Sequence, residues 1–322
     1  MGLATKRFWR FNAQLSEETT EFPIWPKIAA ILCAVTASIH LGTSSFTATG
    51  WNGSFYPSGM QQRDYLSFYA EHFDSVEVDS TFYACPSANT VSGWFSKTPA
   101  NFIFSVKVPQ TITHDKVLLD CDFELKEFLD TMGILEQKLG PIVFQFPFFS
   151  RGAFDDRHQF TDRLVPFLKK LPAAQKFAVE LRNRNWLDAE FAGLLKDHRI
   201  ALVLQDRSWM PNPSELKFDP ITTDWTYIRW LGDRKGIEAI TQTWDKVVVD
   251  RTEELSSWVD FCYQIKKRGV TVYAYANNHY QGHGPATISK FIQLWCEKGL
   301  PEIGKRPTTV KRPVVSQPRL FE

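Results

Sequence analysis

The sequence predicts a single (β/α)8 TIM barrel, and two observations support this fold class. Eight short apolar or alternating runs recur along the 322-residue chain, and their starts lie roughly 25 to 45 residues apart, as in successive strand–helix units. Segments with apolar residues at helical spacing separate most of these runs, and helical connections favour parallel strands. Eight such units match one barrel of ordinary size. An open doubly wound sheet is the alternative, but no G-x-G-x-x-G fingerprint follows the first run.

The expected elements follow from these patterns in chain order. The strands are expected at Ile39–Ser44, Ser75–Tyr83, Phe102–Pro109, Ile142–Pro147, Phe177–Asn183, Ile200–Asp206, Trp225–Gly232 and Val270–Asn278. The helices are expected at Tyr65–His72, Phe123–Lys138, Asp162–Leu171, Asp188–His198, Glu253–Arg268 and Thr287–Lys298.

Three segments are expected from this pattern: an N-terminal extension (1–38), the barrel domain (39–300) and a C-terminal tail (301–322). The extension contains the apolar run Ile28–Ala37, which is too short to span a bilayer and fits a secretory signal poorly, so we expect it to pack on the domain. The tail is basic and rich in proline, and we expect it to be disordered because it has little apolar surface to bury.

The bulk composition excludes a strong global bias toward one class of partner. The formal net charge is +1 and the sequence pI is about 7.7, so no overall field attracts nucleic acid or a membrane. The five cysteines form no C-x-x-C pair, which favours buried thiols in a reducing compartment. We therefore expect a cytoplasmic protein with no membrane association.

The stretch FAVELRNRNW (177–186) places charges in an expected buried strand. Glu180 and Arg182 are two residues apart, so they face the same side, opposite the side that would contact helices. Further polar residues near the ends of expected strands are Glu77, Asp79, Lys107, Gln145, Arg229 and Asn277, and the sixth strand ends in Gln205 and Asp206, of which either could face inward. A buried unpaired charge costs several kcal/mol, so these groups must pair with one another or meet solvent or a ligand.

These inward-facing polar residues predict a site at the C-terminal face of the barrel, which we call the mouth. The active sites of TIM barrels lie at this face. A purely structural network, in which Glu180 pairs with Lys107 or Arg229, is the alternative. A layer of apolar residues would fill a barrel at lower cost, which favours a functional site.

Seven stretches of the sequence together suggest a family. They are LGTSSFTATGWNGSFYP (41–57), VEVDSTFYACP (76–86), FSVKVPQTITH (104–114), LGPIVFQFP (139–147), VELRNRNW (179–186), YIRWLG (227–232) and YANNHYQGHGPATI (275–288). In this order they resemble the YecE-like family, also named domain of unknown function 72, the TM1631-like barrels. The resemblance implies a TIM barrel and no settled activity. Asp79 stands where the resemblance leads us to expect Asn, and Leu231 where we expect His, which removes a candidate ligand or proton carrier.

The residue types at the mouth favour an enzyme that acts on an anionic, phosphate-bearing substrate. Arginine forks bind phosphate or carboxylate in two-pronged geometry, so Arg182 and Arg229, with Lys107, are the expected anion clamp. Glu180 and Glu77 are the candidate acid and base, and Lys107 is a candidate base or imine-forming nucleophile. The further expected substrate contacts are Gln145, Asn277, Asn278, Asp79, Tyr83, His114 and Asp206. A hydrolase or a lyase is favoured, and the reaction is left open.

Two other chemistries are weaker alternatives. Glu77 and Glu180 could form the carboxylate pair of a glycoside hydrolase. The aromatic residues that could stack the sugar are Trp51, Trp94, Trp186, Trp209, Tyr56 and Tyr83. A metal could bind Glu180 and Asp206, but Arg229 and Asn277 occupy positions where acidic ligands would be needed. We therefore expect no obligatory metal and no cofactor.

The tail suggests a nucleic-acid alternative. Gln317, Leu320 and Phe321 form Q-x-x-L-F, which resembles the peptide by which bacterial DNA-processing proteins dock on the sliding clamp. Under this alternative the barrel is an endonuclease IV-like enzyme or a DNA-binding module without turnover. The other interpretation is that Leu320 and Phe321 fold back onto a groove of the barrel. The oligomeric state is left open.

Overall fold

Eight parallel strands form a nearly closed barrel in the computed structural model, which describes residues 37–303. The strands are β1 (Ile39–Thr43), β2 (Ser75–Val78), β3 (Ile103–Lys107), β4 (Leu139–Gln145), β5 (Phe177–Glu180), β6 (Ala201–Asp206), β7 (Trp225–Trp230) and β8 (Thr271–Ala276). Neighbouring strands pair in the order β1-β8-β7-β6-β5-β4-β3-β2, and every pair is parallel. The predicted (β/α)8 barrel is therefore confirmed.

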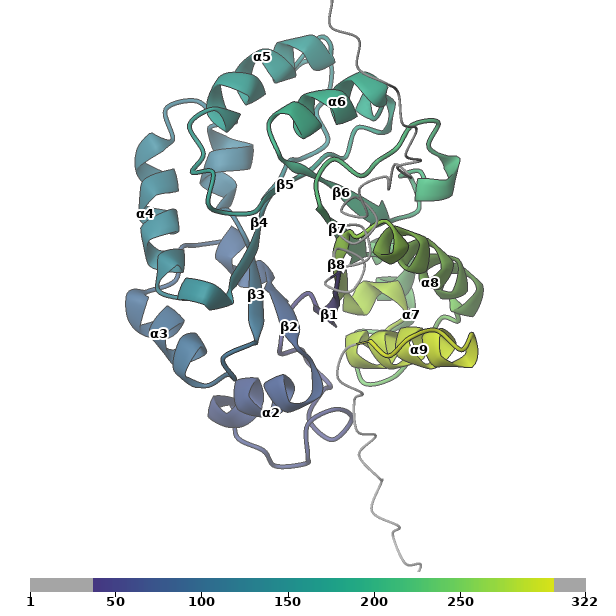
Figure 1. Cartoon of the computed structure of the whole chain (residues 1–322). Helices are drawn as coiled ribbons and strands as arrows, with labels where there is room; N and C mark the ends of the chain where they lie inside the picture. The colour runs from purple at the N-terminus through teal and green to yellow at the C-terminus, as the bar shows by residue number, and fades with distance from the viewer. Residues whose placement is uncertain (1–36, 304–322) are drawn as a thin grey trace, which may run out of the picture.

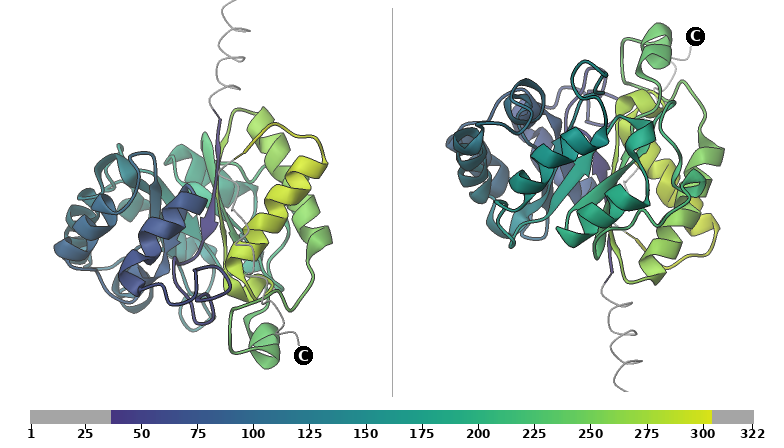
Figure 2. Two further views of the ribbon diagram at one scale, coloured as in Figure 1. Left: turned by 90° about the horizontal axis from the view of Figure 1, so that it is seen from below. Right: turned by 90° about the horizontal axis from the view of Figure 1, so that it is seen from above.

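The helices surround the strands as an outer ring (Figure 1). They are α2 (Tyr65–His72), α3 (Ala88–Ser96), α4 (Asp122–Gly133), α5 (Arg157–Leu168), α6 (Ala189–Asp197), α7 (Arg234–Ile240), α8 (Thr252–Lys267) and α9 (Gly284–Glu297). The side views in Figure 2 show the long helices running beside the strands. Several helix starts are fixed by side chains that accept a hydrogen bond from a backbone N–H of the first turn, such as Asp156 before α5 and Asp188 before α6.

Two apolar layers stabilise this arrangement. The larger layer lies between the strands and the helices and contains most of the buried Phe, Leu, Ile and Trp residues. The smaller layer fills the barrel interior and consists of Val143, Ala178, Ala201, Val203, Trp225, Tyr227, Tyr273 and Tyr275. These interior residues alternate along their strands with residues of the outer layer, as a pleated strand requires.

Helix α2 has the predicted bounds. The predicted strands mostly extend beyond the observed ones, but β4 begins at Leu139, before its predicted start at Ile142. The second run is a strand only to Val78, and residues Asp79–Phe82 form a 3-10 helix instead. Helices α3 and α7 were not predicted, because each buries a single apolar residue, Val91 and Ile237 respectively. The apolar run Ile28–Ala37, apart from Ala37 itself, and the tail from residue 304 lie outside the described residues.

Side chains, in place of a backbone ladder, connect β1 with β2. The backbone N–H of Leu41 donates to the Asp74 carboxylate at 3.1 Å, and the N–H of Thr43 donates to the Tyr69 hydroxyl at 2.8 Å. That hydroxyl donates in turn to the carbonyl of Ser75 at 3.2 Å. Asp74 and Tyr69 therefore satisfy strand groups that a paired ladder would otherwise satisfy.

Gly42 permits the close approach of β1 and β2 at this seam. A Cβ atom at Gly42 would lie 2.1 Å from the carbonyl oxygen of Ser75, a distance that no side chain tolerates. Only glycine therefore fits between the two strands at this position.

Two further predictions concern the burial of the cysteine thiols and the absence of membrane association. Within residues 37–303, Cys121 and Cys262 are buried, whereas Cys85 is half-buried and Cys296 is exposed, so the expectation of buried thiols holds only in part. No helix among the described residues is long and apolar enough to cross a membrane.

Candidate functional site

The strand register brings polar side chains from six strands to one level inside the barrel. Gln145 on β4 is the register partner of Glu180 on β5, and Gln205 on β6 is the register partner of Arg229 on β7. These side chains lie one layer above the apolar interior, toward the carboxyl ends of the strands. The predicted inward direction of Glu180 follows from its alternation with Val179, which packs in the outer layer.

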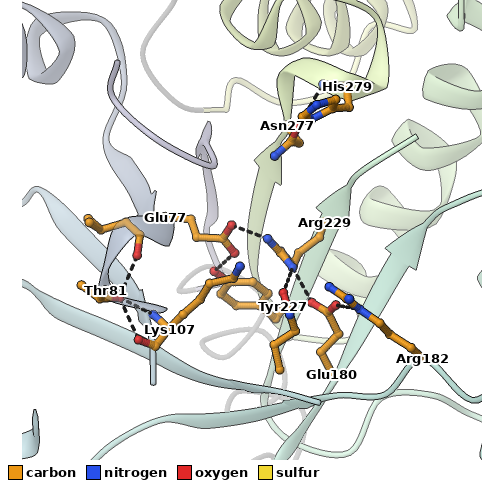
Figure 3. A network of polar contacts seen from close by, with 11 residues as sticks. Glu77, Thr81, Lys107, Glu180, Arg182, Tyr227, Arg229, Asn277 and His279 are labelled. Atoms are coloured by element: carbon orange, nitrogen blue, oxygen red, sulfur yellow. Dashed lines mark hydrogen bonds and ion pairs between the residues drawn. The ribbon is translucent and has the colours of Figure 1, made fainter. Parts of the chain in front are cut away.

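Arg229 is the centre of this cluster (Figure 3). Its Nη1 donates to Glu180 Oε2 at 2.5 Å and to Gln145 Oε1 at 3.2 Å, and its Nη2 donates to Glu77 Oε1 at 2.8 Å. The second oxygen of Glu77 accepts a hydrogen bond of 2.8 Å from the Tyr227 hydroxyl. All five side chains are buried. The Arg229 network, as we name these five residues, therefore links β2, β4, β5 and β7 across the barrel.

Electrostatics within the Arg229 network favour the charged forms of Glu180 and Arg229. Burial alone would raise the pKa of Glu180, but Arg229, Arg182 and Lys107 outweigh it and lower this pKa to about 2. Burial alone would lower the pKa of Arg229, but Glu180 and Glu77 raise it above its usual range. Glu180 is therefore a fixed carboxylate and a poor proton donor, and the charge of Arg229 is already paired with protein carboxylates.

Lys107 differs from Arg229 because its ammonium group has no fixed partner. The side chain of Lys107 is 7% exposed and reaches from β3 toward Glu77 and Tyr227 (Figure 3). No hydrogen bond from its Nζ to another described residue is found, and Nζ lies 5.1 Å from the centre of the Phe82 ring. Burial and then the charge of Arg229 lower the pKa of Lys107 to about 8, against the opposing effect of Glu77. Lys107 is thus a buried amine at the mouth that loses its proton more easily than an ordinary lysine.

Two further arginines stand near Glu180 at the mouth. Arg182 Nε lies 3.6 Å from Glu180 Oε1, which is an ion pair but too long for a hydrogen bond. Arg207 is half-buried, its guanidinium stacks 4.4 Å from the centre of the Trp209 ring, and burial lowers its pKa to about 10. Within residues 37–303, Glu180 Oε1, Arg182 Nε and Arg207 Nε lack hydrogen-bond partners although they are buried. Such atoms require a ligand or water.

A cavity of about 190 Å³ lies at the carboxyl ends of β1 and β8. Its polar lining consists of Thr43, Ser44, Ser45, Thr47, Asp79, Asn277, Asn278 and His279, with Trp51 and Ala276 as its apolar part. Burial and the nearby Glu77 raise the pKa of Asp79 to about 6, against the opposing effect of Lys107. We call this cavity the hydroxyl pocket. The charges of Asp79 and Lys107 interact, so the hydroxyl pocket is electrostatically coupled to the Lys107 amine.

Asn277 and Asn278 have structural contacts in addition to lining the hydroxyl pocket. Asn277 Oδ1 accepts a hydrogen bond from the backbone N–H of His279, and Figure 3 shows the two side chains facing each other. Asn278 Oδ1 accepts from Trp51 Nε1 at 3.2 Å and from the N–H of Gly284 at 2.8 Å. No hydrogen bond from either amide nitrogen to another residue of 37–303 is found.

Asp206 lies outside the site. Its Oδ2 accepts hydrogen bonds from Trp258 Nε1 at 2.7 Å and from the Tyr280 hydroxyl at 2.8 Å, so it faces α8 and the loop after β8. Gln205 is the inward residue at this strand end, since it is the register partner of Arg229 and donates to the carbonyl of Leu181. This placement resolves which of the two residues at the end of β6 faces the barrel interior.

Tyr83 and His114 lie on the rim of the barrel. Both rings contact Phe82, the ring beneath the Lys107 amine. Tyr83 is 72% exposed, whereas His114 is half-buried, and burial together with Arg182 lowers the pKa of His114. His114 is therefore close enough to the site to sense its charges.

Sequence reasoning missed Tyr227, Arg207 and Phe82. The first could have been found, because Tyr227 and Arg229 alternate on β7 in the same way as Glu180 and Arg182 on β5. Arg207 carried no such signal, because it follows the strand end. The aromatic residues expected to stack a ligand differ in burial. Trp51, Tyr56 and Trp186 are buried, Trp94 is partly buried, and Trp209 and Tyr83 are exposed.

In the part of the chain that the structure describes, no set of side chains matches the metal site considered as an alternative. No group of three or more His, Cys, Asp or Glu side chains is arranged to hold an ion among residues 37–303. His283 caps α9 by accepting from the N–H of Ala286, and burial lowers its pKa to about 4. His279 contacts Glu238 Oε1 at 3.0 Å. The two histidines thus have separate structural partners.

A comparison with known families identifies the chain. Residues 40–310 match the model of the family described as protein of unknown function DUF72. The chain belongs to the DUF72 family. This confirms the resemblance noted in the sequence, and the DUF72 barrel carries no established activity that could be transferred to the Arg229 network.

Individual DUF72 relatives are similar over part of the chain. UPF0759 protein YecE of Escherichia coli K12 is 36% identical over 118 residues, covering 37% of this chain and 41% of YecE. UPF0759 protein YunF of Bacillus subtilis is 31% identical over 152 residues, covering 44% of this chain and 52% of YunF. The chain thus spans about half the length of these curated relatives or less.

Solved DUF72 structures share the fold. The DUF72 family protein TM1631 of Thermotoga maritima superposes with a TM-score of 0.63 at 27% identity, covering 80% of this chain and 98% of that chain. The DUF72 family protein EF0366 of Enterococcus faecalis gives a TM-score of 0.58 at 22% identity, covering 80% and 97%. These similarities support the barrel described above.

Proposed function

We propose that the protein is a lyase that forms an imine between Lys107 and a small carbonyl compound bearing a phosphate group. The observation that carries this proposal is the buried Lys107 amine, which lacks a hydrogen-bond partner among the described residues yet stands beside a fixed ion network. An amine becomes a nucleophile when it loses its proton, and burial beside other cations favours that loss. The lowered pKa of Lys107, about 8, supports this role.

The charges around Lys107 favour an anionic substrate. Four basic side chains (Lys107, Arg182, Arg207 and Arg229) face three acidic ones (Glu77, Asp79 and Glu180) at the mouth. Both terminal nitrogens of Arg229 donate to Glu77, Glu180 and Gln145, and its Nε alone lacks a partner among the described residues. For Arg182 and Arg207, in contrast, no hydrogen bond to another described residue is found. We assign the phosphate to these two side chains, since guanidinium groups match phosphate geometry. The anion clamp expected from the sequence thus shifts from Arg229 to Arg207.

The chemistry proceeds through ordinary imine steps. The lone pair of Lys107 Nζ attacks the carbonyl carbon, the C–N bond forms, and the carbonyl oxygen leaves as water after taking up two protons. The resulting cationic imine accepts the electron pair of the Cα–Cβ bond as that bond breaks, which gives an enamine and a carbonyl product, and Asp79 takes the proton of the β-hydroxyl group. Asp79 then returns this proton to the enamine carbon, and hydrolysis of the imine so formed releases the second product and restores the amine. Arg229 favours the ionised form of Glu180, and the carboxylates of Glu77 and Glu180 stabilise the cationic imine.

A glycoside hydrolase is less consistent with this geometry. Such enzymes need one carboxylic acid that is protonated near neutral pH. The pKa of Glu180 is about 2, and Glu77 is engaged by both Arg229 and Tyr227. Neither carboxylate is therefore suited to donate a proton to a leaving sugar.

Reductive trapping tests the proposal. Pyridoxal 5′-phosphate is an aldehyde that carries a phosphate, and borohydride converts its imine into a stable adduct that peptide mass spectrometry locates. We expect the adduct on Lys107 at pH 8, suppressed by inorganic phosphate and absent in Lys107→Arg, with the exposed Lys126 as the internal comparison. Equal labelling of Lys107 and Lys126, or none at Lys107, would contradict an imine-forming enzyme. A nucleic-acid-binding barrel, which would use the same cations, predicts no trapping at all.

A further inference from the structure

The hydroxyl pocket differs chemically from the charged cluster beside it. Its lining provides hydroxyl groups from Thr43, Ser44 and Thr47 and amide groups from Asn277 and Asn278. No lysine or arginine lines it. A phosphate is therefore not expected to enter this cavity, and an apolar group would leave its polar atoms without partners.

Two observations indicate that the hydroxyl pocket receives a polar ligand. Ser44 Oγ is buried and has no hydrogen-bond partner among residues 37–303, although Ser44 borders the cavity. Asp79 lies in the wall of the cavity as a half-buried carboxyl that forms no ion pair within the described part of the chain. Buried polar groups are normally satisfied, so both need a partner. A ligand hydroxyl satisfies each, because it donates to Asp79 and exchanges a hydrogen bond with Ser44.

The position of the hydroxyl pocket relative to Lys107 determines how a ligand would lie. The pocket stands at the ends of β1 and β8, and Figure 3 shows its residues Asn277 and His279 apart from both Lys107 and Arg182, with Arg229 among them. A ligand that reaches all three places would meet hydroxyl-binding groups at the pocket, the amine of Lys107 and the guanidinium group of Arg182.

We infer that the substrate is a short sugar phosphate, whose hydroxyl groups next to its carbonyl carbon enter the hydroxyl pocket while the carbonyl carbon meets Lys107 and the phosphate meets Arg182 and Arg207. The inference rests on the proposed imine chemistry and adds the substrate class. The cavity of about 190 Å³ has room for a few hydroxylated carbons and not for a polymer. Asp79 is then the base that takes a proton from a substrate hydroxyl, and its raised pKa is suited to that role.

Two phosphorus-bearing carbonyl probes test this inference. Ribose 5-phosphate carries the hydroxylated chain, whereas phosphonoacetaldehyde carries the anion and the carbonyl group without hydroxyls. Borohydride trapping at Lys107 is measured against the concentration of each probe's free aldehyde, with peptide mass spectrometry as the readout. We expect half-maximal trapping with ribose 5-phosphate at a concentration at least tenfold lower than with phosphonoacetaldehyde.

Matched variants assign that difference to the pocket. Ser44→Ala should raise the half-maximal concentration for ribose 5-phosphate by about tenfold, the usual effect of losing one buried hydrogen bond. It should leave trapping of phosphonoacetaldehyde unchanged. Ser80→Ala removes an exposed hydroxyl next to Asp79 and should change neither probe.

The outcomes separate the two proposals. Trapping of both probes at equal concentration, or a Ser44→Ala effect that is the same for both probes, would overturn the sugar-phosphate inference and leave the imine proposal standing. Absence of trapping at Lys107 with either probe would instead overturn the imine proposal on which the inference rests.

Discussion

Glu180 on β5 and Arg229 on β7 are joined by a hydrogen bond of 2.5 Å between two side chains that are each at most 3% exposed. Removing one partner of a buried ion pair leaves the other charge uncompensated, which costs about 3–5 kcal/mol. Arg229→Met should therefore lower the free energy of unfolding by this amount, as measured by urea denaturation at pH 7. Arg234→Met, which breaks an exposed pair with Glu238, should change it by less than about 1 kcal/mol. Similar losses in the two variants would refute the buried network.

The acid stability of the protein should depend on Glu180. Its pKa is lowered from the ordinary 4.5 to about 2 in the folded protein, so its ionised form stabilises the fold above pH 4.5. That contribution is lost as the pH falls from 4.5 toward 2. The free energy of unfolding of Glu180→Gln should therefore fall less steeply over this range than that of the wild type. Parallel curves of stability against pH for the two proteins would contradict the assigned shift.

Phosphate should stabilise the protein through Arg182. A ligand at 100 times its dissociation constant adds about 2.7 kcal/mol to the free energy of unfolding. Thermal unfolding with phosphate, compared with chloride at the same ionic strength, should show an increase in Tm for the wild type and a smaller one for Arg182→Ala. Arg184→Ala is the matched control, because Arg184 is exposed and pairs with Glu215 instead. An equal shift in the wild type and Arg182→Ala would exclude Arg182 from the anion site.

The seam between β1 and β2 should depend on Tyr69. Tyr69→Phe leaves the buried N–H of Thr43 without its acceptor, which costs about 1–3 kcal/mol. Hydrogen exchange at the Thr43 amide should accelerate together with this loss in urea denaturation. Tyr65→Phe is the control, since the Tyr65 hydroxyl accepts only from the exposed Asn52 side chain. Unchanged exchange at Thr43 would show that the seam is held by other contacts.

The clamp-docking motif lies outside the described residues and stays a prediction. An immobilised peptide of residues 311–322 should bind a bacterial sliding clamp if Gln317, Leu320 and Phe321 act as a docking motif. The Leu320→Ala, Phe321→Ala peptide is the control and should not bind. Absence of binding at tens of micromolar, or binding that survives the double substitution, would remove the DNA-associated alternative.

Alternation along single strands was the reliable part of the sequence signal. It predicted that Glu180 and Arg182 share one face of β5, and the structure places both at the mouth. Alternation did not show which residue at the end of β6 faces the barrel interior, because Gln205 and Asp206 are adjacent and both polar. Their assignment depends on Trp258 of α8, more than 50 residues later in the sequence, which binds Asp206. A contact between distant segments carries no local pattern.

The pairing of cations with carboxylates within the site could not be predicted from the sequence either. Arg229 was expected to bind substrate, but its position on β7 brings it within hydrogen-bond distance of Glu77 and Glu180. Which cation is occupied and which is available depends on distances across the barrel. The sequence shows only the strand on which each cation stands.

The Arg229 network makes folding of the barrel and assembly of its site a single event. Glu77 and Gln145 come from the first half of the strands, and Glu180 and Arg229 come from the second half. A half-barrel made of β1–β4 would therefore carry Glu77 without its guanidinium partner, and one made of β5–β8 would lack two of the three acceptors of Arg229. Half-barrels of this chain are thus poor independent units, and duplication or exchange of halves is disfavoured by the same side chains that build the mouth.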